Sequence, residues 1–61
     1  MKHIRQIFDP TLVIEEIIYT VVVTDGYEDL TTHPSIVEHP ELFEIVDVEL
    51  PEHYQLLNYS S

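Results

Sequence analysis

A strongly apolar segment occupies residues 11–24, TLVIEEIIYTVVVT, where nine of fourteen residues are Val, Ile, Leu or Tyr. Most of these residues are β-branched or aromatic, the types that are enriched in strands. Asp9 followed by Pro10 would also suit a helix start, but three consecutive valines between two threonines disfavour a helix. The pattern therefore predicts a strand over 17–24 and leaves residues 10–16 open between helix and strand.

The predicted strand has two rows of alternate side chains. One row is wholly apolar (Ile17, Tyr19, Val21, Val23) and the other is mixed (Ile18, Thr20, Val22, Thr24). Asp25-Gly26 follows directly, and Asp-Gly after a β run is a strong hairpin signal. We therefore expect a return strand over 27–31, with Glu28 and Asp29 facing solvent. Its weak hydrophobicity is typical of an edge strand.

Two proline-led segments follow in residues 32–46, which read THPSIVEHPELFEIV. Proline suits the first turn of a helix and interrupts a helix that would run through it. Two short helical turns are therefore expected, at 34–38 and 40–43. His33 and His39 precede the prolines, and we expect these histidines and the neighbouring glutamates to lie at the solvent-exposed rim.

Clean alternation returns in residues 44–50, EIVDVEL, and predicts a half-buried strand that Pro51 ends. One face would carry Ile45, Asp47 and Glu49 and turn toward water or a partner, while the other would carry Val46, Val48 and Leu50. The sheet would then consist of 17–24 and 45–50. Four apolar side chains from the helical turns are expected to pack on it: Ile36, Val37, Leu42 and Phe43.

These elements predict one small α+β domain that is mostly β. We expect an antiparallel sheet, either SH3-like or an open meander, with one or two short helical turns before the last strand. The domain would span 11–50. Residues 1–10 would form an N-terminal arm, in which residues 1–8 are either a short strand or a segment that docks elsewhere. Residues 51–61 would form an extended C-terminal tail.

The charge of the chain is unevenly distributed. Twelve Asp and Glu face two basic residues, Lys2 and Arg5, so the formal net charge is −10 and residues 6–61 contain no Lys or Arg. An acidic body repels nucleic-acid phosphates and anionic membranes, so we expect neither direct nucleic-acid binding nor membrane binding. No apolar run approaches the roughly 20 residues of a membrane span, and the first residues lack the apolar core of a secretory signal.

The residues that could bind a metal or catalyse a reaction do not form a recognisable motif. His33, His39 and His53, with Glu38 and Glu41, offer nitrogen and oxygen ligands. A zinc site needs three or four converging ligands, and the prolines interrupt the helix that would bring the first two histidines together. The chain has no Cys, and its single Gly cannot form a phosphate-binding loop. We therefore expect no enzymatic activity, no metal and no cofactor.

The apolar content favours an interaction protein. A chain of this length buries only about 60% of its unfolded surface, and apolar surface that a monomer cannot cover marks an interaction site. We predict a non-enzymatic protein–protein interaction or assembly protein whose partners are copies of itself or virion proteins. The contacting side chains are expected to be Ile4, Ile7, Phe8, Tyr19, Val21, Tyr54, Leu56, Leu57 and Tyr59.

An alternative hypothesis is an acidic inhibitor that imitates nucleic-acid charge and occupies a host DNA- or RNA-binding protein. This function requires carboxylates in rows at roughly the spacing of phosphates along a nucleic-acid strand. Neighbouring strands could supply such rows from Glu15, Glu16, Glu28, Asp29, Asp47 and Glu49.

Residues 17–46 resemble a module of small uncharacterised bacteriophage proteins. Its features are a Tyr-Thr-Val run, a polar turn, a Thr-His-Pro segment and a Pro-Glu-Leu-Phe-Glu ending, which here begin at Tyr19, Asp25, Thr32 and Pro40. The resemblance implies a small SH3-like unit in an accessory or structural protein of a phage particle, located in the virion or the host cytoplasm. It implies no catalytic residues. This chain has no Gly at 14–16, where such modules often turn.

Overall fold

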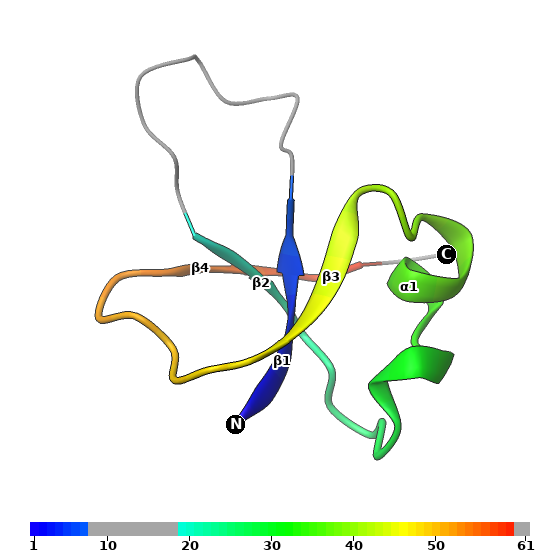
Figure 1. Cartoon of the computed structure of the whole chain (residues 1–61), viewed down its shortest axis with the longest axis horizontal. Coiled ribbons are helices and arrows are strands. Elements are labelled where there is room, and N and C mark those ends of the chain that lie inside the picture. The colour runs from blue at the N-terminus through cyan, green and yellow to red at the C-terminus, as the bar shows by residue number, and fades with distance from the viewer. Residues whose placement is uncertain (8–18, 60–61) are drawn as a thin grey trace.

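The computed structural model describes residues 1–7 and 19–59. Across these residues, four strands form one sheet, and two short helices lie between the second and third strands (Figure 1). The elements are β1 (Lys2–Gln6), β2 (Thr20–Val22), the 3-10 helix η1 (Leu30–Thr32), α1 (Pro34–Glu38), β3 (Phe43–Asp47) and β4 (Gln55–Leu57). The expectation of a mostly β chain with short helical turns is therefore confirmed.

The order of the strands across the sheet is β3-β1-β2-β4. β1 pairs antiparallel with both β2 and β3, whereas β4 pairs parallel with β2. The sheet is therefore mixed, and the predicted antiparallel sheet and open meander are both wrong. A meander pairs strands in chain order, but here the strand from the expected N-terminal arm lies inside the sheet. The expected C-terminal tail supplies β4.

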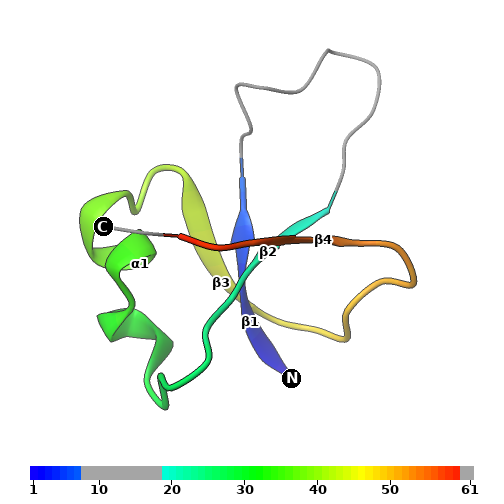
Figure 2. The same cartoon turned by 180° about the vertical axis from the view of Figure 1, so that it is seen from behind.

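The core lies on one face of this sheet. One row of paired residues crosses all four strands on that face: Ile45, Ile4, Val22 and Leu57. Ile4 and Val22 form the buried centre with Phe43, and further apolar side chains pack around them: Leu30, Ile36, Leu42, Ile45, Leu57 and Tyr59. In Figure 2, β4 crosses in front of β1, which shows that the sheet is strongly twisted.

The registers correct the predicted face of one strand and decide the inward row of another. Ile45 lies opposite Ile4 and packs against the core, although its row was expected to face water or a partner. The residue that projects from β2 into the core is Val22, which belongs to the mixed row. In both strands, pairing with β1 decides which row is buried, because neighbouring paired residues project to the same face of a sheet.

No return strand forms over 27–31, so the predicted hairpin is wrong. Gly26 adopts a φ of 87°, which glycine tolerates, and the Tyr27 N–H donates to the Thr24 carbonyl to close a turn. The chain then enters η1, because the Asp29 carboxylate accepts bonds from the Thr31 N–H at 3.0 Å and from the Thr31 hydroxyl at 2.6 Å. Such local side-chain bonds compete with a strand ladder.

The first of the two predicted helical turns is confirmed as α1, but no second helix forms at 40–43. The N–H groups of Leu42 and Phe43 both donate to the His39 carbonyl, which makes one tight turn, and β3 begins at Phe43. Ile36, Leu42 and Phe43 pack in the core as expected. Val37 does not, because successive helical residues point about 100° apart, and its side chain remains 65% exposed.

His33 is buried rather than solvent-exposed, with 3% of its surface accessible. Its Nδ1 accepts the Ser35 N–H at 3.1 Å and lies 2.8 Å from the Ser35 hydroxyl. Because Nδ1 accepts, the ring proton is on Nε2, which lies 3.2 Å from the Val23 carbonyl and donates to it. His33 is therefore the N-cap of α1 and links this helix to the end of β2.

Candidate interaction face

The face of the sheet opposite the core carries a different row of paired residues. This row lies one position along each strand from the core row, and it consists of Glu44, Arg5, Val21 and Leu56. Val46 and His3 form a neighbouring pair on the same side. We call these six residues the outer face. Because strand side chains alternate, a strand that buries its core row must present these residues on the other side.

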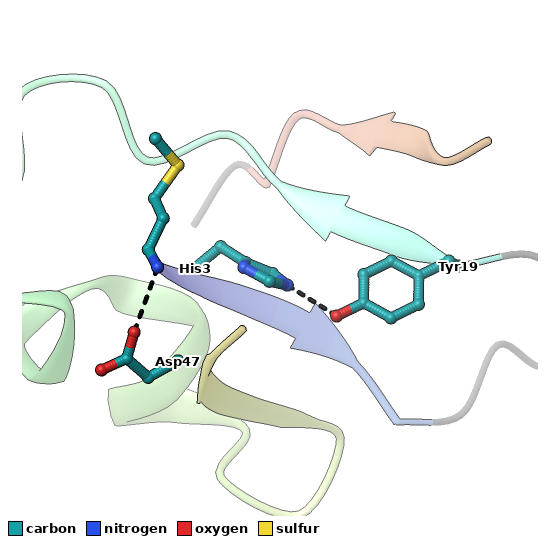
Figure 3. Close-up of polar contacts among 4 residues, drawn as sticks. His3, Tyr19 and Asp47 are labelled. Atoms are coloured by element: carbon teal, nitrogen blue, oxygen red, sulfur yellow. Dashed lines mark hydrogen bonds and ion pairs between the residues drawn. The ribbon is translucent and has the colours of Figure 1, made fainter. Parts of the chain in front are cut away.

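A polar network covers the β1 part of the outer face. The Tyr19 hydroxyl lies 2.6 Å from Nε2 of His3, and Figure 3 shows the two side chains pointing toward each other. The guanidinium carbon of Arg5 lies 4.9 Å from the centre of the Tyr19 ring, within the range of a cation–π contact. Arg5 also donates to the Glu44 carboxylate at 3.1 Å. The Arg5 charge is thus matched within the face.

The network leaves two buried nitrogen atoms without a hydrogen-bond partner in the described part of the chain. These are Nδ1 of His3, whose residue is 4% exposed, and Nε of Arg5. Buried polar groups in proteins are usually paired. His33, the other buried histidine of the described residues, uses both nitrogens, so the outer face is the less completely bonded of the two sides.

Apolar side chains are exposed around this network. Leu56 is 64% exposed, although the adjacent Val21 is buried. Tyr54 directly precedes β4 and is 43% exposed. Ile7 directly follows β1, donates its N–H to the Leu42 carbonyl and is also exposed. The outer face and its margins therefore present uncovered apolar surface.

The nine predicted contact residues fall into different environments. Leu56 is exposed on the outer face, and Val21 belongs to that face but is buried. Ile7 and Tyr54 are exposed next to the ends of β1 and β4, and the half-buried Tyr19 contacts the outer face through His3 and Arg5. Ile4, Leu57 and Tyr59 contribute to the core, so their apolar character completes the fold of this chain. Phe8 lies outside the described residues. Sequence reasoning missed Arg5, Glu44 and Val46 because only the register of β1 with β3 brings them together.

The end of the described chain packs on the helical side. The Tyr59 ring makes an edge contact with Phe43 at 5.7 Å between centroids, and it also lies near His33 and His39. Desolvation by burial is the main cause that raises the pKa of Tyr59 above its ordinary value, and the negative charge of Glu38 adds to it. Tyr59 is thus a packing residue in this structure.

Two carboxylates have lowered pKa values without forming a catalytic arrangement. The hydrogen bond from the Thr31 hydroxyl is the main cause that lowers the pKa of Asp29. The N–H of Glu41 lowers the pKa of its own carboxylate, and a bond to His39 adds to this effect. Both acids are exposed, so these bonds describe local turns rather than an activated group held in a pocket.

An open groove of about 360 Å³ lies between the first residues of β1 and the segment after β2. It is lined by Lys2, Thr24, Tyr27, Glu28, Asp29, Leu30, Thr31 and Ile45. The Asp29 carboxylate in this groove is engaged by Thr31. Within residues 1–7 and 19–59, no group of three His, Asp or Glu side chains could hold a metal ion. No helix in the same ranges has the length and apolarity to cross a bilayer.

Comparisons of the chain with models of protein families, with curated proteins and with solved structures found no match. The geometry of the outer face is therefore the main ground for a functional proposal.

Proposed function

We propose that this chain is a non-enzymatic interaction protein that docks on other protein chains through the outer face of its sheet. The observation that supports this proposal best is the exposure of Leu56 on the face opposite a filled core, with Tyr54 exposed directly before the same strand. Burial of apolar surface is the main favourable term in protein association. The resemblance to bacteriophage proteins supports a role as an accessory component of a phage particle. The SH3-like arrangement of the strands stays a prediction.

The first test measures whether the chain associates with itself through the outer face when salt screens the repulsion between its charges. The mass of the full chain is measured by light scattering, with circular dichroism on the same sample, as NaCl is raised to about 1 M, where the Debye length is about 3 Å. We expect the mass to rise with salt, because screening weakens the repulsion between acidic chains but not apolar contact.

Two variants test whether this self-association uses the outer face. Leu56→Asp should keep the chain monomeric at every salt concentration and should reduce the binding of a hydrophobic dye. Val37→Asp is a matched control, because Val37 is 65% exposed on α1 and Leu56 is 64% exposed on the outer face. A mass that stays monomeric, with a dye signal that Leu56→Asp does not change, would contradict the outer face as a docking surface.

The acidic-inhibitor alternative predicts the opposite dependence on salt. A partner held only by imitation of nucleic-acid charge should be released steeply as salt rises. A partner packed on Leu56 and Tyr54 should be retained, because apolar burial is not screened. The salt dependence of a partner complex therefore separates the two functions.

A further inference from the structure

The charges around the outer face indicate which kind of protein surface it fits. The connection from β3 to β4, residues 48–54, carries Val48 and Tyr54 at its ends and Glu49 and Glu52 between them, all exposed. Neither glutamate forms an ion pair among the described residues. The segment that leads into β4 and contains the exposed Tyr54 thus carries negative charge that forms no ion pair with the described residues.

Positive charge is not available on this side to balance these glutamates. Arg5 is paired with Glu44 at 3.1 Å. Lys2 lies on the core side of β1, where it lines the groove with Asp29. A partner that covers the outer face therefore meets an excess of negative charge and must supply the compensating cations, because a like-charged surface opposite costs free energy.

A second copy of this chain does not meet that requirement. Two copies with a formal charge of −10 each repel one another at low salt, and a large net charge keeps proteins monomeric. A symmetric contact would also bring two acidic surfaces together, because the same patch serves both copies.

We propose that the natural occupant of the outer face is a basic protein segment, with apolar residues that cover Leu56 and Tyr54 and flanking Lys or Arg residues that face Glu49 and Glu52. This inference rests on the proposed function and names its partner class. The apolar contacts supply most of the affinity, while the charges set partner choice and the rate of association.

The test uses the full chain and two synthetic peptides of roughly eight residues, the usual length of a strand. One peptide alternates Lys with Val and the other alternates Glu with Val. Affinity is measured by titration calorimetry at low salt, and the site is located by amide chemical shifts. We expect the lysine peptide to bind at least roughly tenfold more tightly than the glutamate peptide, with shifts at Val21, Val46 and Leu56.

Variants separate charge from apolar contact. Leu56→Ser should weaken the lysine peptide about fivefold, as expected for the loss of one apolar contact, while Val37→Ser leaves its affinity unchanged. The double change Glu49→Gln and Glu52→Gln should weaken binding at low salt and have little effect at about 1 M salt.

Three results would overturn the basic-segment proposal. They are equal binding of the two peptides, lysine-peptide binding that Leu56→Ser leaves unchanged, and self-association through Leu56 at low salt that excludes the peptide. The second result would favour the acidic inhibitor. If no lysine peptide binds but salt-driven association is still lost in Leu56→Asp, the partner class is wrong and the docking face stands.

Discussion

The two faces of this sheet are built from neighbouring residues of the same four strands, yet their environments are opposite. On the core side the row of Ile45, Ile4, Val22 and Leu57 is apolar throughout and packs against the helical segment. One residue away, the row of Glu44, Arg5, Val21 and Leu56 mixes an ion pair, a buried valine and an exposed leucine. On the core side, other segments of this chain cover the apolar row. On the outer side, the apolar side chain of Leu56 remains exposed.

This contrast shows how a small sheet can bury one face and still leave apolar side chains exposed at the other. A chain of 61 residues buries a smaller fraction of its surface than a longer chain does. In this chain, the cluster of buried apolar residues lies on one side of the sheet. The other side keeps residues that a partner can cover.

The largest expected effect tests the core side. Phe43 is 5% exposed at the centre of the core cluster, so Phe43→Ala should destabilise the chain by about 3–5 kcal/mol. Urea denaturation followed by circular dichroism measures this change, and a chain this small should lose most of its folded population. A loss below about 1 kcal/mol would remove Phe43 from the core.

The next test compares two adjacent leucines on opposite faces of β4. Leu57 packs against the core and Leu56 is exposed, so Leu57→Ala should cost about 1–3 kcal/mol and Leu56→Ala less than about 0.5 kcal/mol. Thermal unfolding of both variants at one protein concentration gives the difference. Equal costs would mean that the two faces of β4 are not distinct.

A third test compares the two buried histidines. His33 on the core side caps α1 and uses both ring nitrogens, so His33→Leu should cost about 1–3 kcal/mol, because it leaves buried partners unpaired. His3 on the outer side bonds only through Nε2, to the hydroxyl of the half-buried Tyr19. His3→Leu should therefore cost less, about 1 kcal/mol or below, because it removes one hydrogen bond. Urea titrations of both variants give the two losses in free energy of unfolding, which can then be compared. A cost for His3→Leu as large as that for His33→Leu would contradict the difference in bonding.

The smallest expected effect concerns Asp29, at the edge of the groove on the core side. Its lowered pKa means that its carboxylate stabilises the fold at pH above the unfolded value, and that this contribution is lost as pH falls through the folded pKa. Thr31→Val removes the hydroxyl that bonds this carboxylate and should move the pKa of Asp29 up toward its ordinary value of 3.8.

Carboxyl-detected NMR titration measures this shift, and Thr32→Val is its control. The Thr32 hydroxyl donates to the main-chain carbonyl of Asp29 at 2.7 Å rather than to its carboxylate. A pKa of Asp29 that moves equally in both variants would show that the turn as a whole, and not the Thr31 hydroxyl, holds the carboxylate ionised.

Local features of the chain could be predicted where local chemistry decides them. Pro34 after His33 correctly predicted the start of α1, because proline fixes φ in the first turn of a helix without losing a needed N–H. The strand predicted over 44–50 corresponds to β3, Phe43–Asp47, so the prediction began one residue late and ended three residues late. The turn at Asp25-Gly26 was expected, but the strand after it was not formed, because the Thr31 bonds to Asp29 compete with extended pairing.

Register and partner choice among strands could not be predicted from these local patterns. The residues of β1 were expected in an arm, yet Ile4 is at the centre of the sheet, because it can pair with β2 and β3 at once. The buried state of His33 also had no local signal beyond the helix start, since the Val23 carbonyl that it contacts lies ten residues away. The contact residues of the outer face come together only through these pairings.

The sequence by itself determined that the chain is mostly β, that it has short proline-started turns and that its body is acidic, because propensity and charge are properties of residues and their neighbours. Only the tertiary structure decided that Ile45 and Val22 face inward while Leu56 faces outward. A shift of one residue in strand pairing exchanges the two faces of a strand, and that shift is fixed by contacts between segments far apart in the chain.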